Sequence, residues 1–361
     1  MITCDGSIGG GPEQLRLLCK ELANKINITI ATPIGDSYNL LKEDGFSSSI
    51  INIQQRAINI KDLTRLAKKI RHDSIDIIHS HGKAAGVLGR LLSLFTSVPV
   101  IHTHHGIHVS GFSRSYRFIY LFYERIFNSI EKKTIYVSNS EKDAARKLRI
   151  YRPEKSMVIY NGVNSYISPL NKKQISQSVR KTMNTPLDKI TVITLCRFDK
   201  VKNIDEIIRI SELCPELMFW IIGDGPSRNL FIDKLKLQSV ENIVMPGFIK
   251  DKMRYLVSAD IYLSTSIREG HPISILEAMS LAMPIVASNV AGNCETFTDK
   301  ESGFLYKLGD IVLASRLLKE LSRNPSLRIE MGEAAKRKQK EHFSSNSMSQ
   351  KYMALYSSLL N

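Results

Sequence analysis

Two glutamates in one short stretch, Glu269 and Glu277, have the residue type and spacing that most clearly indicate chemistry. They lie within the sequence REGHPISILEAM (268–279), with Pro272 between them. Proline has a fixed φ and no N–H, so it suits the first turn of a helix, and apolar residues at helical spacing follow it. We therefore expect Glu269 in a loop and Glu277 about one turn inside a helix.

The junction between that loop and that helix is suited to binding phosphate. The first amides of a helix have no carbonyl partner within it, and the helix dipole adds positive charge there. Carboxylates do not themselves bind phosphate, so the two glutamates are better placed to accept hydrogen bonds from hydroxyl groups. A ligand with phosphates between two hydroxylated rings fits this layout, and a nucleotide-sugar is such a ligand.

Two cations, Arg197 and Lys202, follow a predicted strand at 190–195. Ligands of open α/β sheets bind at the carboxyl ends of the strands. Both cations could reach one diphosphate there, the arginine as a planar fork and the lysine as a point charge, and neutralise charge that develops on a leaving group. A solvated pair of cations on a basic protein is the alternative.

Glycine-rich turns follow further predicted strands. Gly9–Gly11 precedes a helix expected from Gln14 and would let backbone amides approach a ligand, although it does not match the dinucleotide-binding fingerprint. A flexible turn is the alternative. Gly223–Pro226 predicts a tight turn, and the backbone of Gly247 and Phe248 is expected to meet a nucleobase.

Histidines cluster in two places near the ends of predicted strands. These are His79 and His81, and then His102, His104, His105 and His108. Because no carboxylates with metal-site spacing accompany them, we expect contacts with sugar or phosphate, in which a neutral histidine donates to a hydroxyl or moves a proton. Metal binding and hydrogen-bonded structural histidines are the alternatives.

The segment 116–133 is rich in aromatic and basic side chains. One interpretation is a core helix flanked by solvated charge. The other is an interfacial patch that docks on anionic lipid. The formal net charge of +15 favours anionic lipid or phosphorylated ligands, and no nucleic-acid-binding signature accompanies it.

The composition is that of a soluble globular protein, and 361 residues predict two or three domains. No apolar run approaches the length of a membrane span, and no signal-peptide pattern opens the chain. The five cysteines are scattered without a C-x-x-C pair, which fits a reducing compartment. We expect a cytoplasmic protein that is peripheral on the inner face of the plasma membrane if 116–133 binds lipid.

Short apolar runs alternate with amphipathic stretches in two series, a rhythm typical of βα units on parallel sheets. The expected strands are 26–31, 75–79, 98–102, 134–138, 190–195, 218–222, 243–245, 261–264 and 284–287. The expected helices are 14–23, 83–95, 116–130, 141–148, 203–213, 229–237, 253–259 and 274–281.

The two series predict two Rossmann-like domains, 1–165 and 188–343. The polar segment 166–187 is expected to be a linker with a short variable part. The final helix, within 344–361, carries apolar residues on one side and is expected to return to the first domain. The first strand is expected to be truncated, because only four residues precede Asp5.

Taken together, these motifs resemble the retaining glycosyltransferases of family 4, which have the two-domain B-type fold. The resemblance runs along nearly the whole chain, and its most specific part is the stretch that contains the two glutamates. The similar segments are the glycine loop at 9–17, IIHSHGKAAGVLGRLL (77–92), VPVIHTHHG (98–106), VSNSEKD (137–143), VIYNGVN (158–164), LCRFDKVKN (195–203), IIGDGP (221–226) and REGHPISILEAMSLAMPIVAS (268–288).

The resemblance implies roles for particular residues. Glu277 would bind the ribose hydroxyls, Glu269 would contact the transferred sugar, Arg197 and Lys202 would neutralise the diphosphate, and His105 would lie near the donor sugar. The further donor-binding residues that it implies are Gly10, Gly11, Gly247, Phe248, Gly270, His271, Pro272, Ile273 and Ser274. In three places the chain departs from the family pattern: Cys196 stands where glycine is usual, His271 replaces a common aromatic residue, and the strand before Gly9–Gly11 is short.

The implied reaction is transfer of a sugar from a nucleotide-sugar, most simply a UDP-sugar, with retention of configuration. The acceptor would be a glycan or a polyprenyl-pyrophosphate-linked oligosaccharide of cell-envelope polysaccharide biosynthesis. The resemblance implies a site in a cleft between the domains that needs no metal or other cofactor. Two alternatives stay open: a sugar-nucleotide epimerase or hydrolase of the same fold, and a non-catalytic protein that binds nucleotide-sugars.

Overall fold

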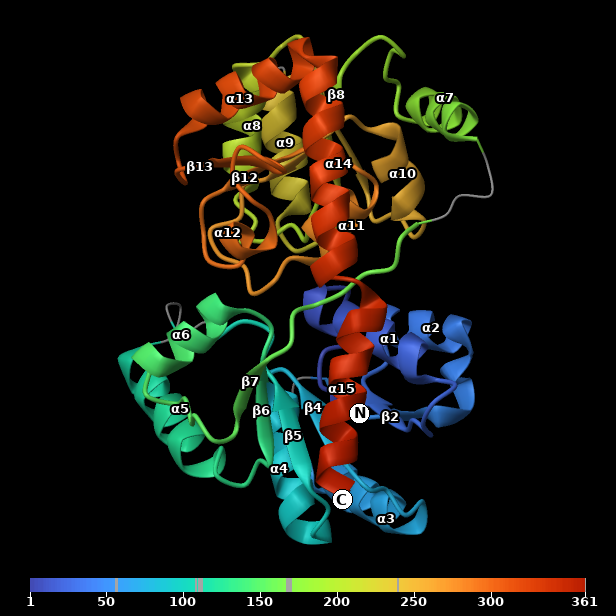
Figure 1. The fold of residues 1–361 in the computed structure, drawn as a ribbon, viewed down its shortest axis with the longest axis vertical. Helices are drawn as coiled ribbons and strands as arrows, with labels where there is room; N and C mark the ends of the chain where they lie inside the picture. Colours follow the sequence, from blue (N-terminus) through green and yellow to red (C-terminus); the bar gives the residue numbers. More distant parts are fainter. Residues whose placement is uncertain (56–57, 108, 110–112, 167–170, 239, 361) are drawn as a thin grey trace. The chain divides into compact units, whose positions relative to one another are not determined.

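The computed structural model describes residues 1–55, 58–107, 109, 113–166, 171–238 and 240–360 (Figure 1). The chain divides into two compact units. Unit 1 comprises Met1–Gly162 and Ser345–Asn361, and unit 2 comprises Val163–Ser344. Each unit is built around its own parallel sheet, as the alternation of apolar runs and amphipathic stretches predicted.

Unit 1 has a seven-stranded parallel sheet in the order β3-β2-β1-β4-β5-β6-β7. Its strands are β1 (Ile2–Thr3), β2 (Ile30–Thr32), β3 (Ile50–Asn52), β4 (Ile78–His81), β5 (Val100–Thr103), β6 (Lys133–Tyr136) and β7 (Ser156–Val158). Its helices are α1 (Gly10–Leu22), α2 (Asp36–Leu41), η1 (Lys42–Phe46), η2 (Ser47–Ser49), α3 (Ile60–His72), α4 (Lys83–Thr96), α5 (Arg114–Phe127), α6 (Asn139–Lys147) and α15 (Ser345–Leu360). The strand order reverses between β1 and β4, which makes the carboxyl ends of these two strands the switch point of the sheet.

Unit 2 has a six-stranded parallel sheet in the order β10-β9-β8-β11-β12-β13. Its strands are β8 (Thr191–Leu195), β9 (Met218–Ile222), β10 (Ile243–Gly247), β11 (Ile261–Ser264), β12 (Ile285–Ser288) and β13 (Gly303–Tyr306). Its helices are α7 (Lys172–Thr182), α8 (Ile204–Glu212), α9 (Arg228–Gln238), α10 (Lys252–Ser258), α11 (Ile273–Ser280), α12 (Asn293–Thr296), α13 (Ile311–Arg323) and α14 (Pro325–His342). Here the order reverses between β8 and β11, so ligands are expected where these two strands end.

The strands of unit 2 are apolar because helices cover both faces of the sheet. All five residues of β8 are buried. Phe219 on β9 belongs to one buried cluster with Ile207 on α8 and Leu318 on α13. Such a core holds the carboxyl ends of the strands in fixed register, which lets the loops beyond them carry the site.

The final helix belongs to unit 1, as predicted. α15 lies beside α1 (Figure 1), and its residues Met348, Tyr352 and Tyr356 are buried in one cluster with Leu18. Unit 1 is therefore made from two segments of the chain, one at each end of the sequence.

The first strand is short, as expected. β1 contributes only Ile2 and Thr3 to the sheet, although the carbonyl of Met1 also accepts a hydrogen bond from the amide of Ala31 (2.8 Å). The terminal ammonium of Met1 donates to the carbonyl of Thr29 (2.6 Å), and burial lowers its pKa. Despite its length, β1 pairs with both β2 and β4.

The segment 166–187 differs from the expected linker, because it belongs to unit 2 and contains α7. Ile175 and Val179 are buried one helical turn apart, and α7 packs against α10. The guanidinium of Arg180 donates to Asp260 (2.9 Å), the residue just before β11. The helix was not predicted because the segment is mostly polar and its apolar stripe is narrow.

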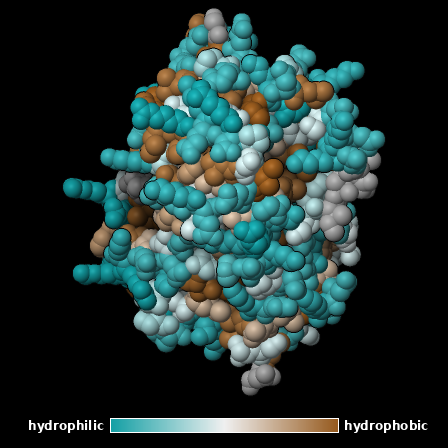
Figure 2. Space-filling model, turned by 45° about the horizontal axis from the view of Figure 1, so that its top comes forward, coloured by the Kyte–Doolittle hydropathy of each residue, from teal (hydrophilic) through white to brown (hydrophobic). Residues whose placement is uncertain are grey.

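One face of the surface is shown in Figure 2, where hydrophilic side chains dominate and hydrophobic ones occur in small groups. Among the described residues, no helix combines the length and the apolar character needed to cross a membrane.

Candidate active site

The two expected cations and one expected glutamate lie at the switch point of the unit 2 sheet. Arg197 and Lys202 follow β8, and Glu269 follows β11, its parallel neighbour. Two hydrogen bonds join the two loops: the Ile267 amide donates to the Val201 carbonyl (2.8 Å), and the Thr265 hydroxyl donates to the Lys202 carbonyl (2.8 Å). The strand order thus brings together residues far apart in the sequence.

Lys202 and Glu269 form an ion pair. The Lys202 ammonium lies 2.6 Å from a carboxylate oxygen of Glu269, and the lysine side chain is 23% exposed. Burial lowers the pKa of Lys202, but the adjacent Glu269 carboxylate raises it further, so the net pKa lies above the ordinary value of 10.5. Lys202 is therefore positively charged at neutral pH.

The Arg197 side chain forms its ion pair with Asp199, a residue of the same loop, and not with Glu269. Its Nε and one terminal nitrogen lie 2.7 and 2.6 Å from Oδ2 of Asp199. The other Asp199 oxygen accepts from the amide of Val201 (2.9 Å). The amide of Lys202 also donates to Oδ1 of Asp199 (3.3 Å), so Asp199 links the Arg197 guanidinium to the backbone of Lys202. The five N–H groups of Arg197 exceed what Asp199 can accept.

Glycine at position 292 positions the Glu269 loop. Gly292 follows β12 with a φ of +87°, and a Cβ there would lie 2.7 Å from the carbonyl oxygen of Gly270 and 2.8 Å from that of Glu269. The Glu269 amide also donates to the carbonyl of Ala291 (3.2 Å). Sequence reasoning missed this residue; the signal was a glycine five positions after the predicted strand 284–287.

The helix after that loop begins as expected, with one correction. α11 starts at Ile273, so Pro272 is the last residue before the helix (φ −76°, ψ 108°) and does not lie in its first turn. The carbonyl of Pro272 accepts from the amides of Ile275 and Leu276 (both 3.2 Å). The amides of Ile273 and Ser274 precede any possible intrahelical partner, which makes them the donors available to a phosphate.

Glu277 lies one turn inside α11, as predicted, and it is buried. One of its carboxylate oxygens lies 2.6 Å from the ammonium of Lys252, the first residue of α10. Sequence reasoning missed Lys252, because nothing in its own segment indicates that the start of α10 lies near Glu277. The second glutamate, like the first, therefore lies against a lysine.

Close backbone approaches join the loops after β8, β9 and β10. A Cβ on Gly223 would lie 1.9 Å from the carbonyl oxygen of Cys196, so only glycine fits. The Gly223 amide donates to the carbonyl of Gly247 (3.0 Å), and Phe248 beyond it is exposed. Burial raises the pKa of the Cys196 thiol to about 12, so the cysteine in the glycine position is neutral.

His271 differs in its surroundings from the other loop residues. Its ring is buried and lies 4.8 Å from the ring of Phe343, centroid to centroid. Burial lowers the pKa of His271 to about 3; Glu295 raises this pKa slightly, and Lys338 lowers it slightly. The side chain therefore packs inside unit 2, and the backbone of the Gly270–Pro272 loop is the part that faces the start of α11.

In unit 1 the structure brings His105 and Gly11 together. A Cβ on Gly11 would lie 3.2 Å from the His105 ring, whereas one on Gly10 would meet nothing within 4 Å. Both glycines belong to the first turn of α1 and not to a preceding loop, because the helix starts at Gly10, earlier than the expected Gln14. Burial, then His104, lowers the pKa of His105 to about 3.

Three other histidines match the structural alternative. His79 is bonded at both ring nitrogens, to the hydroxyls of Tyr356 (2.7 Å) and Thr103 (2.8 Å). His102 is bonded to the Ser80 hydroxyl (2.9 Å), and His104 stacks on Tyr136. His108 lies outside the described residues.

No group of three or more His, Cys, Asp or Glu side chains could hold a metal ion in the part of the chain that the structure describes. The expectation that the protein needs no metal or other cofactor stays a prediction.

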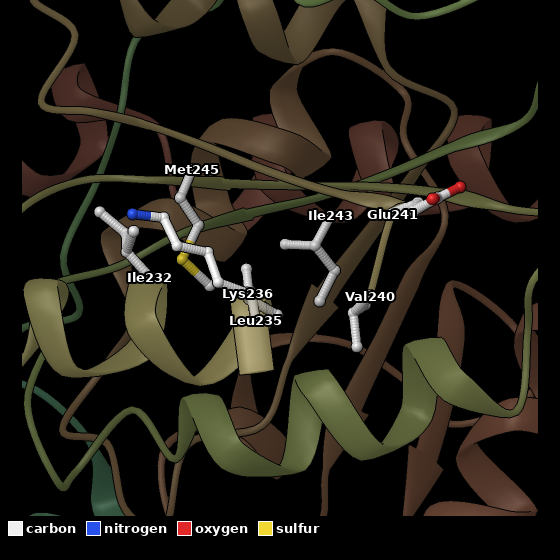
Figure 3. Close-up of a pocket in the computed structure, with 7 residues that line it drawn as sticks. All are labelled: Ile232, Leu235, Lys236, Val240, Glu241, Ile243 and Met245. Atoms are coloured by element: carbon white, nitrogen blue, oxygen red, sulfur yellow. The ribbon is translucent and has the colours of Figure 1, made fainter. Parts of the chain in front are cut away.

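A cavity of about 350 Å³ lies between the C-terminal half of α9 and β10 (Figure 3). Ile232, Leu235 and Lys236 line it from the helix, and Ile243 and Met245 from the strand. Since its lining is mostly apolar and includes none of the residues expected to bind the donor, we assign it no part in the chemistry.

Two parallel-sheet α/β units, with charged pairs at the switch point of the second, define a protein of the B-type glycosyltransferase fold. Family models support this class along most of the chain: "Glycosyltransferase Family 4" matches residues 8–165, and "Glycosyl transferases group 1" matches residues 176–338. The chain belongs to the family 4 glycosyltransferases.

Several curated relatives are bacterial glycosyltransferases. The chain is 28% identical over 265 residues to the Escherichia coli UDP-Gal:alpha-D-GlcNAc-diphosphoundecaprenol alpha-1,3-galactosyltransferase, covering 70% of this chain and 68% of that protein. It is 22% identical to the Staphylococcus aureus capsular polysaccharide biosynthesis glycosyltransferase CapM, covering 94% and 92%.

Solved structures show the same fold. Anabaena Alr3699/HepE, crystallised in complex with UDP-glucose, superposes with a TM-score of 0.86 at 18% identity, covering 99% of this chain and 98% of that one. The glycosyltransferase from Rickettsia africae superposes with a TM-score of 0.82 at 19% identity, covering 100% and 97%.

Proposed function

We propose that this glycosyltransferase moves a sugar from a UDP-sugar to a glycan or polyprenyl-pyrophosphate-linked acceptor in cell-envelope polysaccharide biosynthesis, with retention of configuration. The observation that carries the proposal is the Lys202–Glu269 ion pair at the switch point of unit 2. Glu269 lies in the chain segment that leads into α11, the helix that contains Glu277. The E. coli relative, which by name uses UDP-Gal and a diphosphoundecaprenol-linked acceptor, supports the same donor and acceptor classes.

Charge and geometry support the roles that the family resemblance implies. Lys202 and Arg197 neutralise the diphosphate as the bond to the sugar breaks, and the amides of Ile273 and Ser274 add donors that need no rearrangement. Glu277 accepts hydrogen bonds from the ribose hydroxyls in exchange for part of its contact with Lys252. Glu269 contacts the transferred sugar.

Transfer assays test these roles. Glu277→Ala and Lys202→Ala are each expected to lower kcat/KM at least ~100-fold, as for loss of a group that stabilises transition-state charge, while the fold is retained. Lys200→Ala is the matched control, because Lys200 is an exposed lysine two residues from Lys202, and it should keep wild-type turnover. Near wild-type turnover in the Glu277 or Lys202 variant would overturn the assignment.

The alternatives are separated by omitting the acceptor. An epimerase or hydrolase would convert the donor alone into an epimer or free sugar, and a binding protein would yield no product with any acceptor. We expect a product only when an acceptor is present. EDTA should leave the rate nearly unchanged, and a large loss would indicate a metal. A thermal-shift panel of nucleotide-sugars reports the preferred donor.

The surface of α5 supports a peripheral membrane position for unit 1. Phe118 and Ile119 are 67% and 62% exposed, and Phe122 is also exposed. On the buried side of the helix, Glu124 accepts from the guanidinium of Arg90 (2.7 Å), which fixes the direction in which this apolar surface faces. Arg114, Arg117 and Arg125 on the same helix supply the charge that favours an anionic leaflet.

Co-sedimentation with vesicles tests this surface. Phosphatidylglycerol vesicles should retain the protein and phosphatidylcholine vesicles should retain much less. Changing Arg114, Arg117 and Arg125 to Glu should abolish retention. The control changes three exposed arginines of unit 2, Arg316, Arg323 and Arg337, to Glu and alters net charge equally. Equal binding by both triple variants would rule out α5 as the docking surface.

A further inference from the structure

Two histidines at adjoining strand ends of unit 1 contact each other through their ring nitrogens. His81 is the last residue of β4, and His105 lies two residues beyond the end of the neighbouring strand β5. Nδ1 of His81 lies 3.2 Å from Nε2 of His105, and the rings are within 16° of parallel. The contact joins the histidine expected at the donor sugar to a histidine with no assigned role.

In a hydrogen bond between two neutral imidazoles, one proton lies between the two nitrogen atoms in contact. Burial lowers the pKa of both histidines, so each ring carries a single N–H. One ring therefore donates and the other accepts. The tautomer of His81 consequently sets the tautomer of His105.

The other nitrogen of His81 decides which ring donates. Its Nε2 is buried and has no hydrogen-bond partner among the described residues. If His105 donated, the proton of His81 would lie on this Nε2, as a buried donor with no acceptor. If His81 donates, Nε2 is a bare acceptor, and buried acceptors without a partner are less rare than buried donors without one.

We propose that His81 is a positioning residue that donates from Nδ1 to Nε2 of His105 and thereby fixes the proton of His105 on Nδ1. This inference rests on the proposed function for its consequence. Nδ1 of His105 has no hydrogen-bond partner within the described residues, so its N–H is available to a sugar hydroxyl. A Cβ on Gly11 would lie closest to Cδ2, Cγ and Cβ of His105, and Nδ1 is not among these nearest atoms.

Neighbouring groups hold His81 in place. The ring of His79 lies 4.0 Å from that of His81, centroid to centroid. His79 is itself fixed at both nitrogens by Tyr356 of α15 and Thr103 of β5. The position of His81 therefore depends on the final helix as well as on the sheet.

The tautomer is measured directly by NMR. In protein labelled with ¹³C,¹⁵N-histidine, long-range ¹⁵N–¹H correlations of His105, assigned with a His105→Gln variant, should show a protonated Nδ1 and an unprotonated Nε2 at pH 7.5. A protonated Nε2 in the wild type would overturn the proposal. The spectrum requires no turnover, so failure of the proposed function would not be mistaken for failure of this inference.

Two substitutions add a functional test. His81→Asn can place an amide N–H near the position of Nδ1, whereas His81→Phe keeps the ring and removes the donor. We expect His81→Asn to keep the Nδ1–H tautomer and most of kcat. His81→Phe should move the proton of His105 partly to Nε2 and lower kcat at least tenfold, with a smaller change in KM. Equal kcat losses with an unchanged tautomer would indicate that His81 only packs. If His81→Phe does not fold, the wild-type spectrum still decides.

Discussion

Each glutamate of the unit 2 site forms an ion pair with a lysine. This pairing affects how these residues bind a ligand and how they respond to substitution. Lys202 is drawn toward Glu269 by opposite charge, so a diphosphate that binds Lys202 competes with the carboxylate for its N–H groups. The pair holds Lys202 protonated and oriented before the phosphate binds.

Glu269→Gln tests this coupling. Without the carboxylate, burial becomes the dominant effect on Lys202, so its pKa should fall below the wild-type value. Transfer should fall about 100-fold, since Glu269 positions the cation and, in the proposed function, contacts the transferred sugar. The pKa is followed by ¹³Cε resonances of labelled lysine and the rate by product formation. A Lys202 pKa that stays or rises in the variant would contradict the coupling.

The same ion pair predicts a pH window for stability. A lysine whose pKa is raised on folding contributes fully below the ordinary value of 10.5, and the contribution is lost as pH rises through the folded-state pKa. We expect Lys202→Met to cost about 1 kcal/mol of unfolding free energy at pH 8 and to cost less above pH 10.5. Urea denaturation of the wild type and the variant at both pH values measures this loss of unfolding free energy. A larger loss above pH 10.5 than at pH 8 would contradict the prediction.

At the scale of elements, the loop that carries Glu269 packs closely against the loop after β12, and Gly292 makes this close approach possible. Gly292→Ala would drive a Cβ into the backbone of Glu269 and Gly270, in addition to the strain of a positive φ. Gly309→Ala is the matched control, because its φ of +88° is nearly the same and a Cβ there meets nothing within 4 Å.

We expect Gly309→Ala to cost about 1 kcal/mol and to keep activity. Gly292→Ala should cost a further ~2 kcal/mol, as overpacking does, and lower kcat at least ~10-fold by displacing Glu269. Chemical denaturation and transfer assays measure both effects. Similar activity in the two alanine variants would show that the contact with Gly292 does not position the site.

The elements that could be predicted from sequence are those with a strong local pattern. The loop and helix around Glu269 and Glu277 were predicted because proline and the apolar spacing mark the helix start. Lys252 and Gly292 were not, since their roles depend on which elements lie side by side. The burial of the His271 side chain was not predicted, because its partner Phe343 follows α14 and is far away in the sequence. α7 was missed because its apolar stripe is narrow.

At the scale of the whole molecule, unit 1 is completed by the last helix of the chain. The alternation of strands and helices predicted both sheets, and the one-sided apolar pattern of 344–361 predicted the return of α15. β3, β7 and β13 were not predicted, because each has only three or four residues and lies at an edge of its sheet.

The only tryptophan, Trp220, is buried in unit 2, so its fluorescence reports that unit. Tyr352 of α15 is buried in unit 1, where its hydroxyl contacts Gln14 (3.3 Å) and Thr103 (3.2 Å). Tyr352→Ala should destabilise unit 1 by about 3–5 kcal/mol and lower the circular dichroism midpoint. The Trp220 midpoint should change much less, and an equal shift in both would show that the units unfold as one.

The most direct test of the central claim is isothermal titration of UDP into the wild type, Glu277→Ala and Lys202→Ala. If the carboxyl edge of the unit 2 sheet holds the nucleoside diphosphate, each substitution should weaken binding at least tenfold, which corresponds to about 1.4 kcal/mol. The Lys200→Ala control should bind like the wild type. Unchanged affinity for UDP in both site variants would contradict the account.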